Sequence, residues 1–443
     1  MEALRDRDYR HLWHPYTNID RYERGPWRCI TRAEGVYLYD DGGTPKLDGI
    51  ASWWCVALGH SHPRLLAAIQ QQAAQLQHSI LGNLAHAPAI ELAARLAAIA
   101  PGPLNHVYFA ADGSSATEAA LKIAIQYWTN RGERGRTRFL CLEDGYHGDT
   151  LGAMGVGFVP HFHAPYAPVV AEAVRLPVPH AGCACGECAS RDACLNRCMQ
   201  AADQLFAAHA HEAAALIVEP LCQGAAGVRI YPAEYLRHLR QLCDRHNVLL
   251  IADEIAVGLG RTGDWFACSS AGVAPDLLCI GKALTGGYLP MSACIATGAI
   301  YDTFRDGPNG EDHTFYDGHT FCGNPICAAA ALAALDEFEA AGLLARARVI
   351  GERLADAFAE LATHPAVAHS ACLGAIGMVS MADGAEAARA AAHHAWDHGL
   401  YIRPLGASLY LWPPLIATDD ELAAMRAGFR AALDAVAGVS ASL

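Results

Sequence analysis

The feature that most constrains this chain is a short, wholly apolar run that ends in two carboxylates, Val248-Leu-Leu-Ile-Ala-Asp253-Glu254. A strand that is apolar on both sides must be buried on both faces, which is typical of a parallel sheet covered by helices. Similar runs recur through the middle of the chain, separated by helical patterns at 116–128 and 233–246. The strands that we expect cover 106–110, 139–143, 215–219, 248–253, 276–280 and 293–297. The pattern predicts an α/β fold built on a mostly parallel sheet.

The two ends of the chain follow different patterns. The first 55 residues, with a turn at Asp41-Gly42-Gly43, are expected to form a separate N-terminal segment. Near the other end, a long Ala/Leu-rich helical run at 327–361 leads into a strand–helix–strand region at 374–404. At 443 residues the chain is long enough for two lobes. We therefore expect three segments, at 1–55, 56–327 and 328–443.

Charge and composition exclude several classes of protein. The formal net charge is −14 at pH 7, and no cluster of Lys and Arg is dense enough to bind a nucleic acid. No stretch approaches the roughly 18 consecutive apolar residues of a membrane span. The charged first residues lack the apolar centre of a signal peptide, and the sixteen cysteines are expected to stay reduced. The composition favours a cytoplasmic protein that acts on small molecules, without nucleic-acid or membrane partners.

A single lysine follows another of these apolar runs, in Leu277-Leu-Cys-Ile-Gly-Lys282. An amine held at the end of a buried strand can form a Schiff base with an aldehyde cofactor and afterwards act as a base. The ordinary alternative is a lysine that reaches the surface, which the Gly-rich Thr285-Gly-Gly287 beside it disfavours. Asp253 also has an ordinary alternative, the capping of the next helix, and its own pattern does not decide between the two.

Two further motifs indicate a flat, phosphorylated ligand. Ala111-Asp-Gly-Ser-Ser115 follows a predicted strand and opens a helix, so the backbone N–H groups of Gly113 and Ser114 can hold a phosphate. Tyr146, in the loop after the next strand, can stack on a planar ring. Ordinary helix capping and ordinary packing are the alternatives for each motif alone. Together, however, a lysine, a buried carboxylate, a phosphate cradle and an aromatic ring are what pyridoxal phosphate requires.

These residues lie in motifs that resemble the class III aminotransferases of pyridoxal-phosphate fold type I. The class-wide motifs are Ile251-Ala-Asp-Glu-Ile255, Gly260-Arg-Thr-Gly263, Gly281-Lys-Ala-Leu284 and Thr320-Phe-Cys-Gly-Asn-Pro325. Within the class, the chain resembles the biotin-pathway aminotransferases that use S-adenosylmethionine. The motifs closer to that group are His14-Pro-Tyr-Thr17, Ser52-Trp-Trp54, His86-Ala-Pro88, Gly145-Tyr-His-Gly-Asp-Thr150, Tyr401-Ile-Arg-Pro404 and Tyr410-Leu-Trp-Pro-Pro414. The resemblance covers nearly the whole chain.

The resemblance implies a fold and a set of residue roles. The fold is a large domain with a mostly parallel seven-stranded sheet, joined to a smaller α+β domain that combines the N- and C-terminal segments. Lys282 resembles the Schiff-base lysine, Asp253 the partner of the pyridine nitrogen, and Tyr146 a catalytic group beside the ring. The implied cofactor-binding residues are Gly113, Ser114, Tyr146, Asp253, Lys282, His319 and Thr320. The implied substrate-binding residues are Tyr16, Trp53, Tyr146, Lys282, Gly318 and Arg403.

The resemblance also implies substrates and an assembly. The reaction is amino transfer from S-adenosylmethionine to 7-keto-8-aminopelargonate, giving 7,8-diaminopelargonate, with Arg403 as a bidentate anchor for a carboxylate. Gly318 and Thr320 are expected to reach the other subunit's site, which makes the enzyme a homodimer with composite active sites. Four alternatives stay open. Two are enzymes, a class III transaminase of ω-amines with pyruvate or 2-oxoglutarate as acceptor and an aminomutase of the same fold. The other two are a non-catalytic cofactor-binding protein and a metal-binding module built on the cysteines.

Two features depart from the family pattern. His319 stands where the family often has proline, so we expect a backbone contact there without the rigidity of proline. Five cysteines, at Cys183, Cys185, Cys188, Cys194 and Cys198, have near-ligand spacing for tetrahedral zinc. That spacing fits no familiar zinc knuckle closely, and amino transfer needs no metal. We therefore assign no metal ligand to the active site and leave open whether this cluster binds a metal or holds reduced thiols.

Overall fold

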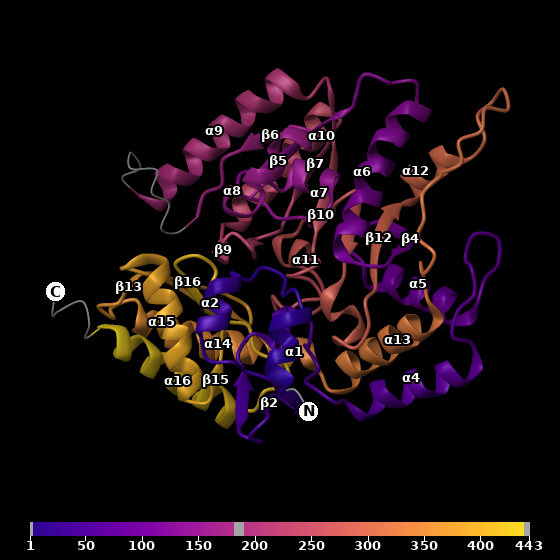
Figure 1. Ribbon diagram of the computed structural model, residues 1–443. Helices are drawn as coiled ribbons and strands as arrows, with labels where there is room; N and C mark the ends of the chain where they lie inside the picture. Colours follow the sequence, from indigo (N-terminus) through magenta and orange to yellow (C-terminus); the bar gives the residue numbers. More distant parts are fainter. Residues whose placement is uncertain (1–2, 181–189, 438–443) are drawn as a thin grey trace.

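The computed structural model describes residues 3–180 and 190–437, and its centre is a seven-stranded sheet with helices on both faces (Figure 1). In sheet order the strands are β4 (Leu104–Ala110), β12 (Ser292–Thr297), β11 (Leu277–Ile280), β10 (Leu249–Asp253), β7 (Ala213–Val218), β5 (Arg138–Leu142) and β6 (Val174–Leu176). Six of them lie within two residues of the predicted ranges, and β6 is too short to show a pattern. Within this sheet only β12 pairs antiparallel with its neighbours, which confirms the mostly parallel arrangement.

Each face of the sheet has its own apolar core. On β10, Leu250 and Ala252 join one buried cluster, whereas Leu249 and Ile251 join the other. Helix α6 packs into the second cluster, and helices α5, α9 and α10 pack into the first. The helices are α5 (Ala87–Ile99), α6 (Gly113–Asn130), α9 (Arg191–His209) and α10 (Ala233–His246). Because both faces are buried, the strand carries no polar residue before Asp253.

The two ends of the chain combine at the lower left of Figure 1. One small sheet joins three N-terminal strands to a C-terminal one, with β15 parallel to β3, which confirms that both ends build the smaller α+β unit. Its strands are β1 (Ile30–Glu34), β2 (Tyr37–Asp40), β3 (Pro45–Asp48) and β15 (Leu400–Tyr401). A second small sheet contains β13 (Val367–Leu373), β14 (Ile376–Met381) and β16 (Ser408–Leu411). Helices α14 (Leu343–Leu361) and α15 (Gly384–Asp397) pack on this second sheet, and α16 (Asp419–Ala437) packs on α15.

The prediction of one continuous helix over 327–361 is wrong. The segment forms α13 (Pro325–Ala340) and then α14, and between them Gly342 adopts a left-handed conformation with φ of +61°. Glycine reaches this conformation without a steric cost, so it ends one helix and starts another in a new direction. Helix α13 packs on α4 (Pro63–Gln75) and α5 below the large sheet, whereas α14 packs on β13 and β14.

The remaining short helices lie in connections between these layers. They are α1 (Leu4–His11), α2 (Ile19–Arg24), α3 (Ala51–Trp54), α7 (Leu151–Val156), α8 (Pro160–His163), α11 (Ala267–Ala271) and α12 (Gly298–Tyr301). Helices α1 and α2 bury none of their side chains. No helix in the described ranges is long and apolar enough to span a membrane.

Candidate active site

Most of the predicted catalytic and cofactor-binding residues lie together at the carboxyl ends of the parallel strands. Asp253 is the last residue of β10, and Lys282 follows β11 after one glycine. The loop after β4 brings Gly113, and the loop after β5 brings Tyr146. These four residues, together with Ser114, line one cavity of about 420 Å³, which we call the inner cavity. Ligands of open α/β sheets bind at this edge because loops of successive strands meet there.

Asp253 is 4% exposed and is held by two hydrogen bonds. Its Oδ1 accepts from the backbone N–H of Ile255 at 3.0 Å, and its Oδ2 lies 2.7 Å from Nδ1 of His147. The His147 ring is itself buried, and its Nε2 is among the buried polar atoms without a hydrogen-bond partner in the described part of the chain. These two hydrogen bonds fix the carboxylate, and its remaining lone pairs are available to a group in the inner cavity.

The phosphate cradle lies at the start of α6. Asp112 caps this helix by accepting from the backbone N–H and the hydroxyl of Ser115 at 3.0 and 2.9 Å. The first N–H groups of a helix have no partner within it, so those of Gly113 and Ser114 are available to an anion. Gly148 has φ of +121°, and a Cβ there would lie 2.0 Å from the Ser114 hydroxyl oxygen. The cradle therefore depends on a glycine that lets the Tyr146 loop approach α6.

Lys282 lies where two cavities meet. Its backbone has φ of +46°, and its Nζ is 5.1 Å from the ring centroid of Trp54. It borders the inner cavity and also a larger outer cavity of about 810 Å³, as do Trp54, Cys55 and Tyr146. An amine in this position can act on a ligand held in the inner cavity and on a substrate that enters through the outer one.

Three hydroxyl and carboxylate groups form a network at the mouth of the site. The Tyr16 hydroxyl donates to both oxygens of Asp149 at 2.6 Å, and the Tyr146 hydroxyl donates to Asp149 Oδ2 at 3.0 Å. Burial, and then the hydrogen bond to Asp149, raise the pKa of Tyr16 to about 12. Both effects also raise the pKa of Tyr146. The two phenols therefore stay protonated at neutral pH and act as donors that hold the carboxylate.

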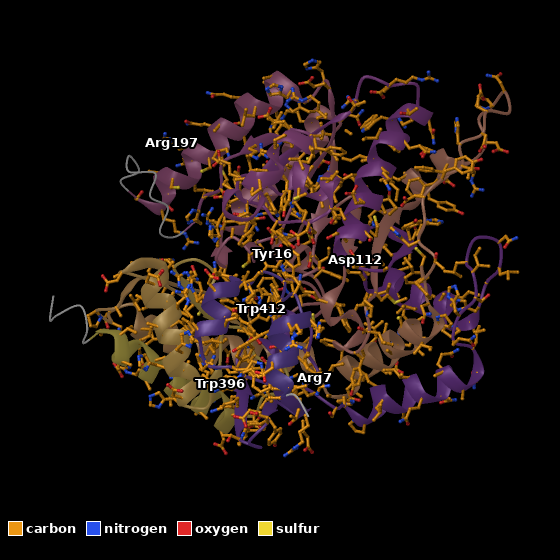
Figure 2. The ribbon with its side chains drawn as sticks, viewed as in Figure 1. Arg7, Tyr16, Asp112, Arg197, Trp396 and Trp412 are labelled. Carbon is orange, nitrogen blue, oxygen red and sulfur yellow. The ribbon has the colours of Figure 1, made fainter. Side chains whose placement is uncertain are left out.

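The outer cavity brings together the predicted substrate residues Tyr16, Trp53 and Arg403. The guanidinium carbon of Arg403 lies 4.2 Å from the Trp53 ring centroid, and one of its nitrogens donates to the Tyr16 carbonyl at 3.2 Å. Phe162 packs edge-on against Tyr16 at 5.3 Å. Figure 2 shows Tyr16 and Asp112 near the centre of the molecule, between the N-terminal helices and the large sheet. The cavity thus has aromatic walls and several cationic side chains, Arg21, Lys282, Arg389 and Arg403, and Asp149 lies beside it, bonded to its wall residues Tyr16 and Tyr146.

Three predicted residues do not join this site within the same chain. Gly318, His319 and Thr320 are exposed, and none of them lines either cavity. Their loop packs on the neighbouring loop through Asn324, which donates to the Gln77 carbonyl at 3.0 Å. On this loop and on the loop at 76–86, four apolar side chains are exposed: Ile80, Leu84, Tyr316 and Phe321.

The sequence analysis did not assign a role to two buried groups of the inner cavity, Glu219 and His147. Glu219 accepts from the backbone N–H groups of Tyr146 and Gly224 at 3.0 and 2.8 Å. Burial raises its pKa to about 7. Its signal was an acid directly after a buried strand, the same signal that identified Asp253. His147 gave no such signal, because its partner is 106 positions away in the sequence.

The two described cysteines of the cluster lie apart from the site. Cys183, Cys185 and Cys188 fall outside the described residues, whereas Cys194 and Cys198 are buried on α9. These two border a separate cavity of about 450 Å³ beside His180. Within residues 3–180 and 190–437 no three side chains are arranged as ligands of a metal ion.

A sheet with a lysine, a buried carboxylate and a helix N-terminus around one cavity is the arrangement of the pyridoxal-phosphate-dependent enzymes of fold type I, a group that includes the aminotransferases. The glycine-dependent cradle, the fixed carboxylate and the adjacent amine fit that cofactor. Residues 19–433 match the family model described as aminotransferase class-III, and the chain belongs to this family.

The chain is similar to aminotransferases that are named for different substrates. The adenosylmethionine-8-amino-7-oxononanoate aminotransferase of Nitratidesulfovibrio vulgaris is 40% identical over 98% of this chain and 82% of its own length. The solved structure of the enzyme of that name from Methanocaldococcus jannaschii superimposes with a TM-score of 0.90, at 33% identity over 98% of both chains. An amine transaminase from an uncultivated Pseudomonas species, solved with pyridoxal phosphate bound, has a TM-score of 0.91 and 34% identity over 96% of this chain and 99% of its own. The shared fold therefore does not distinguish substrates.

Proposed function

We propose that this aminotransferase moves an amino group from S-adenosylmethionine to 8-amino-7-oxononanoate (7-keto-8-aminopelargonate), giving 7,8-diaminopelargonate in cytoplasmic biotin synthesis. The similarity to the Nitratidesulfovibrio and Methanocaldococcus enzymes, which are named for this reaction, supports these substrates. The observation that carries the proposal is an aromatic cavity that opens onto Lys282, with Arg403 in its wall and Asp149 bonded to its wall residues Tyr16 and Tyr146. Asp149 offers an anion to a cationic donor, and Arg403 offers a cation to an acceptor that ends in a carboxylate.

The inner cavity holds the cofactor in this proposal. The N–H groups of Gly113 and Ser114 bind its phosphate, Asp253 binds its pyridine nitrogen, and Tyr146 packs beside its ring. When bound, pyridoxal phosphate supplies an aldehyde that takes up the amino group and an electron sink for the substrate carbon. Lys282 would hold the cofactor covalently between turnovers, and its amine, once free, would move the proton at the substrate carbon.

The outer cavity serves both substrates in turn. Asp149, held by Tyr16 and Tyr146, attracts the sulfonium of S-adenosylmethionine, and the faces of Trp53 and Tyr16 add a cation–π contribution. After the donor has left, Arg403 binds the carboxylate of the acceptor. Trp53 packs on the guanidinium and keeps its donors directed into the cavity. A single site can therefore run both halves of the reaction.

We also propose that the enzyme is a homodimer with composite active sites. Thr320 binds the cofactor phosphate of the other subunit, His319 adds a backbone contact, and Gly318 borders the other subunit's substrate. Their exposure, and the exposed apolar side chains Tyr316 and Phe321 on the same loop, support a surface that a second copy covers. In the same arrangement residues 56–327 form the large domain, while 1–55 and 328–443 form the smaller one.

The donor is tested by single-turnover spectroscopy of the cofactor-loaded enzyme. S-adenosylmethionine is expected to convert the bound cofactor from its aldehyde to its amine form, and 8-amino-7-oxononanoate is expected to restore the starting spectrum. Ornithine, lysine and a simple ω-amine serve as matched donors. If one of these reacts efficiently and S-adenosylmethionine does not, the proposed donor is wrong, although the enzyme remains an aminotransferase.

The composite site is tested by mixing two inactive variants, Lys282→Ala and Thr320→Ala. Each site would take Lys282 from one subunit and Thr320 from the other, so a mixed dimer regains one intact site out of two. Partial recovery of turnover after mixing is the expected result. Mixed dimers that form, as judged by mass spectrometry, and remain inactive would contradict the shared site.

A further inference from the structure

The segment between β3 and α4 contains a left-handed helical turn, α3. The φ values of its four residues are +47°, +44°, +67° and +72°, although none of them is glycine. Such residues rarely adopt this region, because Cβ comes too close to the following carbonyl oxygen. Backbone hydrogen bonds from Trp54 to the Ile50 carbonyl at 2.9 Å and from Cys55 to the Ala51 carbonyl at 3.0 Å close the turn. A run of four strained residues persists only where the surroundings enforce it.

The turn places two tryptophans against the two cations of the site. Trp54 faces Lys282 in the inner cavity, with 5.1 Å from Nζ to the ring centroid. Trp53 faces Arg403 in the outer cavity, with 4.2 Å from the guanidinium carbon to the ring centroid. Trp54 is 3% exposed and stacks on Trp412, with 4.9 Å between ring centroids. One short turn therefore fixes a wall of each cavity on the two sides of Lys282.

A buried carboxylate holds the turn in this shape. Asp48, the last residue of β3, is 0% exposed. It accepts from the Ser52 hydroxyl at 2.7 Å and the Ile50 backbone N–H at 3.3 Å, and it lies 2.9 Å from Nε2 of His60. Hydrogen bonds to a carboxylate are stronger than those between neutral groups, and a buried charge that loses one is costly. The Ser52 bond ties the middle of the strained turn to a residue that cannot move into water.

We propose that Ser52 and Asp48 are positioning residues for the amino transfer. Their side chains hydrogen-bond to each other and act through Trp53 and Trp54, which they hold against Arg403 and Lys282. If the turn relaxed to an ordinary backbone conformation, both rings would leave these cations. The role concerns amino transfer itself and does not depend on which donor the enzyme uses.

Two Ser52 variants separate positioning from stability. Ser52→Ala removes the hydroxyl and keeps Cβ, whereas Ser52→Gly also removes the steric strain of a positive φ. Positioning predicts that Ser52→Gly melts at a higher temperature than Ser52→Ala and yet is the poorer enzyme. Its kcat/KM is expected to fall by roughly 10-fold or more, because a loosened turn misplaces the groups around Lys282. A purely structural role predicts the opposite order of activity, since the less strained variant would be the better enzyme.

Ser61 provides a matched control. It also has a positive φ, of +55°, and its hydroxyl donates to the Ala33 carbonyl at 2.6 Å, but it is exposed and lines neither cavity. Ser61→Gly should melt above Ser61→Ala for the same steric reason. Both variants should keep the kcat/KM of the unmodified enzyme.

A measurement without cofactor completes the test. The stacked Trp54–Trp412 pair should contribute to the near-ultraviolet circular dichroism of the apoenzyme. This signal should weaken in Ser52→Ala, Ser52→Gly and Asp48→Asn and stay unchanged in the Ser61 variants. Asp48→Asn keeps the shape of the side chain and replaces Ser52→Ala if that variant does not fold. Unchanged spectra and kcat/KM at both Ser52 and Asp48 would overturn the proposal. So would a loss of activity that follows melting temperature across all variants.

Discussion

The inner and outer cavities meet at Lys282 but are built in different ways. The inner cavity is made by the ends of parallel strands, and its acids Asp253 and Glu219 are 4% and 5% exposed. The outer cavity is made by segments far apart in the sequence, and the acid bonded to its wall residues Tyr16 and Tyr146, Asp149, has a side chain that is 49% exposed. Buried, prearranged groups suit chemistry common to a whole class, whereas a wet and wide cavity suits the choice of substrate. The four predictions that follow test this division.

The largest effect is expected at the junction of the two cavities. Lys282→Ala should lower turnover by about 10⁴-fold or more, because it removes both the covalent attachment and the proton carrier. The chain has only three lysines, at 46, 122 and 282. Borohydride reduction of the loaded enzyme, followed by peptide mass spectrometry, should therefore place the cofactor on Lys282 alone. The control Lys122→Ala removes a surface ion pair with Asp317 and should stay active. Cofactor attached at another lysine would refute the assignment.

A smaller effect, confined to the outer cavity, is expected for Arg403→Ala. Loss of a hydrogen-bonded charge should weaken acceptor binding by roughly 1.5–3 kcal/mol. The visible spectrum of the bound cofactor should not change, because Arg403 does not line the inner cavity. Separate measurement of the two half-reactions checks this, with Arg64→Ala, which breaks an exposed pair with Glu337, as the control. An equal loss in cofactor binding would mean that the two cavities do not act independently.

The burial of the inner cavity predicts a pH dependence of stability. The pKa of Glu219 in the folded protein is about 7, above its usual value, so the folded state binds this proton more tightly than the unfolded state does. The stability linked to Glu219 is therefore complete at low pH and is lost as pH rises from about 4.5 through 7.

Between pH 5 and 8, the free energy of unfolding of the unmodified protein should fall relative to that of Glu219→Gln by roughly 1–2 kcal/mol. Urea unfolding at several pH values measures this difference. At the partly exposed Glu212, hydrogen bonding to His209 lowers the pKa, so the free energy of unfolding of the unmodified protein should not fall in this way relative to that of Glu212→Gln. Parallel pH profiles for the unmodified protein and Glu219→Gln would show that Glu219 is not buried as described.

The smallest effect is expected for the half-exposed Asp149. Asp149→Asn should weaken a cationic donor by about 1 kcal/mol or less, because water and salt screen an exposed charge. The loss should shrink further as ionic strength rises, whereas the effect of Lys282→Ala should not depend on salt. Donor affinity measured at low and high salt checks both statements. A loss of donor affinity that is large and independent of salt would mean that Asp149 is shielded from water when substrate is bound.

The strands that carry the site could be predicted closely, because each is a wholly apolar run with a reactive residue at its end. Asp253 and Lys282 were found in this way, and Glu219 carries the same signal. The break in the helical run at 327–361 was missed because Ala341 and Gly342 hardly disturb an Ala-rich pattern. No local pattern could show the left-handed turn of α3 either, since its residues are ordinary and the carboxylate of Asp48 enforces its shape.

The sequence by itself determined the parallel sheet and the class of cofactor, and it predicts the residues that deliver the chemistry, because apolar runs and strand-end positions are local properties of the chain. The tertiary structure decided which groups surround them. Only folding brings His147 to Asp253, 106 positions away, and Tyr16 to Asp149, 133 positions away. Only folding turns Trp53 and Trp54 towards Arg403 and Lys282. These pairings depend on how layers pack, and packing is decided by the whole core rather than by any one segment.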